Sequence, residues 1–385
     1  MSQFCAILRH NLSNCSIPWR QKYADAPIPA PNGRDMGRFA ARFSRCSVQR
    51  FVLGPDKAMM KGQAMRLIID TDTAGDDCFS MLLALHQPGV TVEAVTICGG
   101  NIDFDQQVEN ALYTLEVAGK GGKVPVYPGC RRPMMRKPID AEYVFGEDGM
   151  SDAHYPRAHQ RPEASHAVQA LIDIVMSNPG EITILAQAPL TNIAAAVVQE
   201  PRFAGAVKHL WIMGGTDNSL GNVTPAAEFN FYVDPEAAQI VMNAGFACTL
   251  STWTLSVQDS GILAAELADI AALDTPLSRF FTQVNQASVD FSMARYGVGD
   301  SLHPDALTCA IMLDESLILE SGDCVVDVET QGRLTRGYSS VSSPRLPAQE
   351  VADPELGSAT PANARVIRRA DRAAFVQMMR RALGA

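Results

Sequence analysis

The sequence lacks several features that would place it in a particular class of protein. Its 9 cysteines include no C-x-x-C pair and are odd in number, so neither a zinc site nor a disulfide framework is indicated. No stretch approaches about 18 consecutive apolar residues and the N-terminus has no secretory hydrophobic region, which argues against a membrane span or export. The body of the chain has no Lys/Arg cluster and the formal net charge is -10, which disfavours a nucleic-acid surface. These absences predict a cytoplasmic protein with reduced thiols and a small neutral or cationic ligand.

Residues 1–64 differ in composition from the rest of the chain. They contain basic residues in excess over three acidic ones, Asp25, Asp35 and Asp56, and show no sustained apolar period. We interpret the segment as an extension outside the fold: a disordered tail, the product of an upstream start codon, or a transit peptide. The folded domain is then predicted to cover residues 65–385.

From Arg66 onward, short apolar runs alternate with segments of helical periodicity. Strands are predicted at 67–69, 92–97, 124–127, 182–185, 207–213 and 247–250, and helices at 77–85, 106–118, 164–176, 191–199 and 235–243. Strands that alternate with helices of this length indicate right-handed crossovers. The predicted fold is a single α/β domain with a mainly parallel central sheet flanked by helices. Because such sheets bind ligands at the carboxyl ends of their strands, polar residues at those ends are the candidates for a site.

Four aspartates lie where the first predicted strand meets its helix: Asp70, Asp72, Asp76 and Asp77. No Lys or Arg lies between them, and carboxylates this close raise one another's pKa unless a cation compensates their charge. All the available ligand atoms are oxygens, so a hard ion such as Ca²⁺ or Mg²⁺ is predicted rather than Zn²⁺. Gly75 allows the chain to turn back so that Asp77 faces Asp72 across one ion, which leaves Asp76 for a substrate hydroxyl. The alternative is that two of the aspartates cap the N-terminus of the helix.

Polar residues also follow the later predicted strands. Asn101 comes after two glycines, and the turn that begins at Gln187 exposes backbone carbonyls of the kind that complete a calcium shell. Further along, side chains suited to sugar hydroxyls or to the same ion are Asn222, Glu228, Asn230 and Asp305. For each of these residues an ordinary structural role, such as a turn asparagine, a helix cap or a solvated loop residue, stays open as the alternative.

Taken together, these segments resemble the inosine-uridine-preferring nucleoside hydrolases. The run from Asp70 to Asp77 resembles the D-x-D-x-G-x-D-D opening of that family, although Ala74 stands at the family's usual first glycine and Gly75 follows it. Later segments resemble family blocks in the same order: Gly99-Gly-Asn101, Ala188-Pro-Leu-Thr-Asn192, Met213-Gly-Gly215, Gly221-Asn222, Glu228-Phe-Asn230, 234–238 and Asp305-Ala-Leu. The resemblance implies a Rossmann-like core, a ribonucleoside substrate, a part in nucleoside catabolism or salvage, and a homodimer or homotetramer.

The resemblance also implies a role for each matching residue. Asp72 and Asp77 would hold Ca²⁺ with Asp305 and the backbone carbonyl of Gln187, and Asp72 would act as general base toward the ion-bound water. Asn101 would lie near the reacting carbon as a further catalytic residue. Asp70 would not touch the ion but would support the loop that carries Asp72 and Asp77. The residues implied to contact the substrate are Asp76, Asn101, Met213, Asn222, Glu228, Asn230 and Asp305. Carboxylates under the ribose suit this chemistry, because glycosidic cleavage passes through an oxocarbenium-like transition state.

The sequence departs from the family pattern at the residues that would protonate the leaving base. Many members have His-Asp where this chain has Pro304-Asp305, and His303 stands one place earlier. A shift of one residue at a helix start redirects a side chain by about 100°. A second family histidine aligns with Phe145, whose ring would stack on a purine; the alternative is that Phe145 belongs to the hydrophobic core. Phe145 and His303 are therefore both substrate-binding candidates. Because of its displacement by one residue, however, the His303 side chain is expected not to point at the base.

The prediction is hydrolysis of ribonucleosides to ribose and free base, with purine nucleosides slightly favoured. Two alternatives stay open. One is a catalytically silent protein on the same fold that binds nucleosides or ribose. The other is a phosphohydrolase similar to the haloacid dehalogenases, because Asp70-Thr-Asp72 after an apolar strand matches the start of their D-x-D motif.

Overall fold

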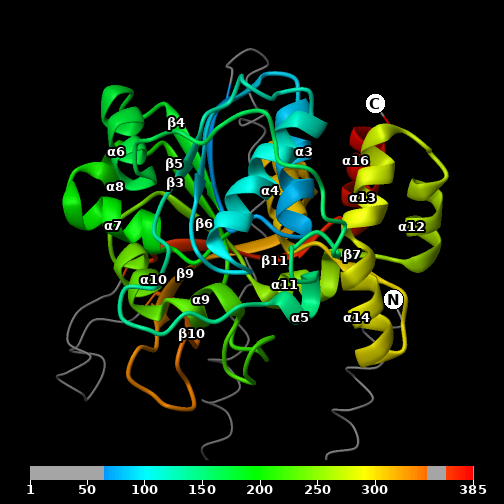
Figure 1. The fold of residues 1–385 in the computed structure, drawn as a ribbon. Helices are drawn as coiled ribbons and strands as arrows, with labels where there is room; N and C mark the ends of the chain where they lie inside the picture. The colour runs from blue at the N-terminus through cyan, green and yellow to red at the C-terminus, as the bar shows by residue number, and fades with distance from the viewer. Residues whose placement is uncertain (1–64, 345–360, 385) are drawn as a thin grey trace, which may run out of the picture. The chain divides into compact units, whose positions relative to one another are not determined.

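A computed structural model describes residues 65–344 and 361–384, and the fold reported below is that of these residues (Figure 1). The predicted extension, residues 1–64, lies outside the described residues. No helix in the described ranges is long and apolar enough to cross a membrane.

The core of the fold is a nine-stranded sheet with the order β10-β9-β11-β6-β5-β4-β1-β2-β3. Its strands are β1 (Met65–Thr71), β2 (Val90–Ile97), β3 (Val126–Pro128), β4 (Ile182–Ala186), β5 (His209–Met213), β6 (Cys248–Ser251), β9 (Ile318–Val328), β10 (Ser339–Ser342) and β11 (Ala364–Ala370). Neighbours from β3 across to β11 are parallel, whereas β9 runs antiparallel to both β11 and β10. The predicted α/β fold with a mainly parallel sheet is therefore confirmed.

Two hydrophobic cores lie on opposite faces of this sheet. Along β1, Leu67 and Ile69 pack into one core and Ile68 into the other, as expected for side chains that alternate along a strand buried on both faces. The first core includes residues of α3 (Asp76–His86), α4 (Phe104–Val117), α13 (Pro276–Val284), α15 (Pro304–Leu313) and α16 (Arg372–Leu383). The second includes residues of α6 (Ala167–Ser177), α7 (Thr191–Gln199), α8 (Phe203–Ala206) and α10 (Pro235–Met242). Figure 1 shows the two groups on either side of the strands.

Shorter elements lie beyond the carboxyl ends of the parallel strands. These are α5 (Glu142–Phe145), α9 (Phe229–Val233), α11 (Trp253–Asp259), α14 (Gln286–Tyr296) and the two-stranded ribbon of β7 (Gly261–Ile262) and β8 (Ser301–Leu302). The helix α12 (Ala264–Ala271) packs against α13 and α16 on the face of the sheet. The helices α5 and α14 contact each other. This layer covers the edge of the sheet at which a ligand site is expected.

The turn between β1 and α3 depends on a glycine. Gly75 has a φ of 47°, and a Cβ atom there would lie 2.4 Å from Cδ1 of Phe145. Its amide donates to the carbonyl of Gly149 at 2.8 Å, so the turn is anchored to the segment that follows α5. A side chain at this position would be strained by the positive φ and would also displace the Phe145 ring.

Candidate active site

Three buried carboxylates meet where α3 and α15 begin. Oxygen atoms of Asp76, Asp77 and Asp305 all lie within 4.8 Å of one another, a separation that one metal ion can bridge. The backbone amide of Asp305 donates to Oδ2 of Asp76 at 2.9 Å, which ties the two helix starts together. Both helix N-termini therefore point their positive ends at the same group of carboxylates.

Asp72 adds a fourth carboxylate beside this cluster. It is fully buried at the end of β1, and the amide of Asn101 donates to its Oδ2 at 3.0 Å. Its other oxygen, Oδ1, has no hydrogen-bond partner in the part of the chain that the structure describes. An unsatisfied buried carboxylate oxygen is costly, because burial removes the water that would otherwise solvate it. A cation at this position would remove that cost.

The electrostatics of the cluster also indicate a missing positive charge. Burial, followed by repulsion from Asp77, raises the pKa of Asp72 well above its usual range and that of Asp76 to about 8. Burial raises the pKa of Asp77 to about 6, and burial with repulsion from Asp76 raises that of Asp305 well above its usual range. The charged groups that act on these four carboxylates are other carboxylates. The oxygen-only donor set fits a hard divalent ion.

The alternative in which the aspartates serve as helix caps is not what the structure shows. The N-cap of α3 is Gly75, and no side chain of the described residues forms a capping hydrogen bond at this helix start. Oδ2 of Asp77 instead accepts from the amide of Ala74 at 3.2 Å, and its Oδ1 accepts from the Thr71 hydroxyl at 2.5 Å. These bonds hold the Asp77 carboxylate against the end of β1, so its orientation is fixed before any ion binds.

Asp70 lies behind these residues in the body of the sheet. Its Oδ1 accepts from the hydroxyl of Thr96 on β2 at 2.6 Å and from the amide of Asn192 on α7 at 2.8 Å. Asn192 also donates to the carbonyl of Ile97 at 3.0 Å. Asp70 thus joins the ends of β1 and β2 to the start of α7, and it does not line the cavity.

Asn101 connects β2 to the carboxylates at the end of β1. Its side-chain amide donates to Oδ2 of Asp77 at 3.2 Å, in addition to its backbone bond to Asp72. The approach requires the preceding glycine, because a Cβ on Gly100 would lie 2.0 Å from Oδ2 of Asp72. Gly100 is therefore required for a steric reason at the site itself, whereas a Cβ on Gly99 would lie 2.6 Å from the carbonyl oxygen of Arg131.

The ends of β4 and β5 are joined through Gln187 and Asn230. The Gln187 side chain donates to Oδ1 of Asp77 at 3.0 Å, while its backbone carbonyl lies 3.5 Å from Nδ2 of Asn230. The same Asn230 amide donates to the carbonyl of Met213 at 3.1 Å. Four strand ends, those of β1, β2, β4 and β5, thus contribute to one hydrogen-bonded group of residues.

Glu228 is held by backbone amides. As the N-cap of α9, it accepts from Asn230 at 2.8 Å through Oε1 and from Gly215 at 2.8 Å through Oε2. Burial raises its pKa to about 7 in spite of these bonds. From the sequence, Glu228 was either a sugar-binding residue or a solvated loop residue. In the structure its carboxylate is buried and lines the cavity, so Glu228 is not a solvated loop residue.

A cavity of about 170 Å³ opens over this group of residues. Nine of the residues expected to contact an ion or a substrate line it: Asp76, Asn101, Phe145, Gln187, Met213, Asn222, Glu228, Asn230 and Asp305. Asp72 and Asp77 are buried next to it and bonded to Asn101. Residues that are up to 229 positions apart in sequence are thereby brought to one site.

His303 is not among the residues that line the cavity. It is fully buried, its Nε2 lies 2.7 Å from the Ser301 hydroxyl, and its ring centroid lies 5.5 Å from those of Phe79 and Phe281. Burial lowers its pKa to about 3. The structure thus places His303 against aromatic side chains of the core and away from the cavity, so the geometry does not support the substrate-binding role expected for it.

Aromatic side chains that the sequence reasoning did not find form much of the remaining wall. They come from four elements: Tyr143 of α5, Phe229 of α9, Trp253 of α11, and Phe291 and Tyr296 of α14. The ring centroids of Tyr143 and Phe291 lie 5.9 Å apart, and those of Phe291 and Tyr296 lie 6.4 Å apart. No pattern in the sequence links α5 to α14, so only their tertiary contact shows that these rings share a wall.

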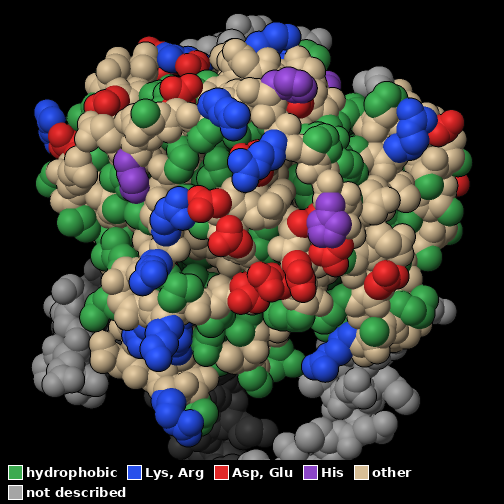
Figure 2. Space-filling view, viewed as in Figure 1, with side chains coloured by type: hydrophobic (Ala, Val, Ile, Leu, Met, Phe, Trp, Pro, Cys, Tyr) green, Lys and Arg blue, Asp and Glu red, His purple; other side chains and the backbone are tan. Residues whose placement is uncertain are grey.

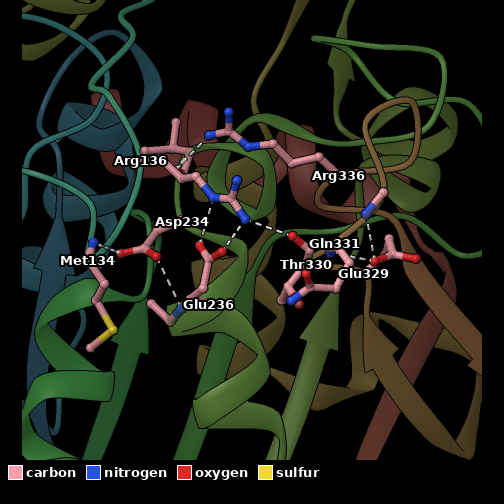
Figure 3. A network of polar contacts seen from close by, with 11 residues as sticks. Met134, Arg136, Asp234, Glu236, Glu329, Thr330, Gln331 and Arg336 are labelled. Atoms are coloured by element: carbon pink, nitrogen blue, oxygen red, sulfur yellow. Dashed lines mark hydrogen bonds and ion pairs between the residues drawn. The ribbon is translucent and has the colours of Figure 1, made fainter.

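The segment that leads into α5 is anchored by a polar network (Figure 3). Arg136 forms an ion pair with Glu236 of α10 and donates to the carbonyl of Thr330 at 2.7 Å. Nearby, the amide of Met134 donates to Oδ2 of Asp234 at 2.8 Å. These bonds fix the path of residues 129–141, and with it the position of the aromatic side chains of α5 at the cavity.

Comparisons with known proteins identify the family and the fold. The family model described as inosine-uridine preferring nucleoside hydrolase matches residues 67–377. The chain is 32% identical over 319 residues to a pyrimidine-specific ribonucleoside hydrolase from Shewanella sp. (strain ANA-3), a match that covers 81% of this chain and 94% of that protein. It is 33% identical over 278 residues to an inosine-uridine preferring nucleoside hydrolase from Leishmania major, with 72% and 87% of the two chains covered.

A solved structure agrees with these relatives. A plant nucleoside hydrolase superposes with a TM-score of 0.78 at 30% identity, and the match covers 84% of this chain and 99% of that one. The relatives' names differ in base preference, so they do not determine the preference of this enzyme. The chain belongs to the inosine-uridine preferring nucleoside hydrolase family, and it is a nucleoside hydrolase.

Proposed function

We propose that this enzyme is a calcium-dependent ribonucleoside hydrolase in which Asp72 is the general base. One observation carries the proposal: among the described residues, the charged groups that act on this buried group of carboxylates are other carboxylates, and Oδ1 of Asp72 accepts no hydrogen bond from any of them. Asp72, Asp77, Asp305 and the carbonyl of Gln187 would hold the ion. When bound, Ca²⁺ would orient a water molecule and make it easier to deprotonate.

The residues of the chain supply the rest of the chemistry. Asp72 accepts the proton of the attacking water, and its orientation is set by the amide of Asn101. Asp76 and Asn230 would bind the ribose hydroxyls, and buried Glu228 would accept a hydrogen bond from a further hydroxyl. The carboxylates stabilise positive charge that develops on the sugar in the transition state.

The aromatic wall is the basis for base selection. Phe145 lines the cavity beside other rings and offers a flat surface for stacking. A purine presents the larger face to such a wall, which supports a slight preference for purine nucleosides. Neither the silent binding protein nor the phosphohydrolase is favoured by a specific observation. The homo-oligomer and the cytoplasmic location stay predictions.

The test is a panel of inosine, guanosine, adenosine, uridine and cytidine, assayed for free base with calcium and after chelation. We expect release from inosine and guanosine at least as fast as from uridine, and loss of activity on chelation that calcium restores. Asp72→Asn is expected to lower kcat by about a thousandfold, since removal of a positioned base typically costs 10²–10⁴. Full activity of Asp72→Asn, or no effect of a chelator, would refute the proposal.

A further inference from the structure

Helix α4 carries two buried side-chain amides on its inner side. Gln107 and Asn110 are three positions apart, so they lie on the same side of the helix, and their relative exposures are 0% and 2%. The carboxylates of α4 are partly or fully exposed: Asp105, Glu109 and Glu116. Figure 2 shows acidic side chains gathered on the face of the molecule that carries α4. Because buried amides require hydrogen-bond partners, the bonds of these two side chains show what the helix holds in place.

Gln107 is bonded to the backbone of the turn that follows β2. Its Nε2 donates to the carbonyl of Cys98 at 2.6 Å, and its Oε1 accepts from the amides of Gly100 and Ile102 at 3.2 and 3.3 Å. This turn is buried and lies beyond the end of β2, where its backbone groups need partners from outside the sheet. Because the two amides flank Asn101, Gln107 fixes the backbone on both sides of that residue.

Asn101 passes this constraint on to Asp72. Its backbone amide donates to Oδ2 of Asp72 at 3.0 Å, whereas Oδ1 of Asp72 accepts no hydrogen bond from the described residues. The orientation of the Asp72 carboxylate therefore depends on where the turn places the Asn101 amide. Gln107 itself is not among the residues that line the cavity. Its influence on the site is thus indirect and passes through Asn101.

Asn110 holds the end of β1 in a similar way. Its Nδ2 donates to the carbonyls of Thr73 and Asp148 at 3.1 and 2.8 Å. Thr73 directly follows Asp72 in the chain. One face of α4 is therefore bonded both to the backbone beside Asp72 and to the backbone beside Asn101. The position of these two residues relative to each other is set by the helix that lies behind them.

We propose that Gln107 is a positioning residue for the hydrolysis: it holds the turn that orients the carboxylate of Asp72. This inference rests on the proposed function, in which Asp72 accepts the proton of the attacking water. Loss of the Gln107 amide then slows the chemical step through Asp72. Nucleoside binding changes little, because Asp76 and Asn230, which are proposed to bind the ribose, lie on α3 and α9.

The experiment is a double-mutant cycle on the full chain, with inosine as substrate and calcium at saturation. Gln107→Met keeps about the volume of the side chain and removes its donor and its acceptor. It is made in the parent enzyme and in Asp72→Asn, and kcat, KM, Tm and the calcium affinity measured by calorimetry are compared. Thr114→Val is the matched control, because Thr114 is a buried polar residue of the same helix whose hydroxyl donates to the carbonyl of Asn110 at 2.8 Å, within α4.

We expect Gln107→Met to lower kcat about thirtyfold and to change KM less than about twofold, since misplacement of a catalytic group by about 1 Å can cost about a hundredfold in rate. In Asp72→Asn the same substitution should lower kcat less than about threefold, because the group that it positions is already absent. Calcium binding should weaken about tenfold in Gln107→Met, as it does when residues that orient metal ligands are removed. Thr114→Val should lower Tm but leave kcat and calcium binding unchanged.

An unchanged kcat in Gln107→Met, or equal losses of kcat in the parent enzyme and in Asp72→Asn, would overturn this inference while the proposed function stands. A rise in KM without a fall in kcat would overturn it as well. If Gln107→Met does not fold, Gln107→Asn replaces it, because its amide is one methylene too short to reach the turn and the same split between kcat and KM is expected. Full activity of Asp72→Asn alone would instead refute the proposed function, whatever Gln107→Met does.

Discussion

Replacement of Gly100 by alanine tests whether the position of Asp72 controls the reaction. The added Cβ would lie 2.0 Å from Oδ2 of Asp72 and 2.8 Å from its Cγ. Contacts this short cannot persist, so either the Asp72 carboxylate rotates or the β2 end moves away. In both cases the bond of 3.0 Å from the Asn101 amide to Asp72 is broken or lengthened.

The size of the effect follows from these contacts. A hydrogen bond to a charged group contributes about 1.5–3 kcal/mol, and an extra methyl group in a packed interior costs about 1–3 kcal/mol. We therefore expect the free energy of unfolding to fall by about 2 kcal/mol. Displacement of a catalytic group by about 1 Å can cost about a hundredfold in rate. Because Asp72 is the proposed base, kcat/KM should fall about a hundredfold.

Base release from inosine and uridine is the assay, with thermal unfolding in the presence and absence of calcium as the measure of folding. The control is Gly205→Ala, since a Cβ on Gly205 meets nothing within 4 Å. Gly205→Ala should keep full activity. If Gly100→Ala folds and retains kcat/KM within about threefold of the parent enzyme, the proposed role of Asp72 is wrong.

Three further predictions follow from the site and its supports. Asp77 has a pKa of about 6 and Asp76 a pKa of about 8, and both exceed the ordinary aspartate value of 3.8. Between about pH 4 and pH 8 the ion-free folded protein therefore binds more protons than the unfolded chain. Its Tm should fall as pH rises from about 4 to 8, and calcium should remove most of that slope; a Tm that rises with pH would contradict the assignment. His303→Asn should lower Tm and leave the shape of the pH–rate profile unchanged, because the buried ring offers no proton to the departing base. If the fall in rate on the alkaline side of the profile disappears in this variant, His303 is the leaving-group acid and this reasoning is wrong. Arg136→Ala should raise KM a few-fold by loosening the segment before α5, whereas Arg202→Ala, which breaks an exposed ion pair, should change neither KM nor Tm.

Much of the fold could be predicted because the parallel strands β1 to β6 are recognisable from short apolar runs in the sequence. The strands predicted from apolar runs correspond to β1 to β6, since strands buried on both faces must be continuously apolar. The strands β9, β10 and β11, which form the part of the sheet that contains the antiparallel pairs, were not predicted. These strands carry charged residues such as Glu320, Asp323 and Arg368, because they are less completely buried, and their periodicity is accordingly weak.

The carboxylate cluster proposed to hold an ion was predictable to a similar degree, and for an electrostatic reason. Asp70, Asp72, Asp76 and Asp77 are close in sequence, so their mutual repulsion is visible without a structure. Asp305 has no such local signal. The resemblance to the family linked it to the others, and the structure shows its amide bonded to Asp76 at 2.9 Å.

The sequence by itself determined which residues carry charge to the end of β1 and that no nearby cation neutralises them, because both facts depend only on order along the chain. Only the tertiary structure decided what faces those carboxylates across the cavity. The contact between α5 and α14 brings Tyr143 and Phe291 together, and packing against Phe79 and Phe281 turns His303 into the core. Side-chain direction and the meeting of distant helices are set by packing, which leaves no local pattern in the sequence.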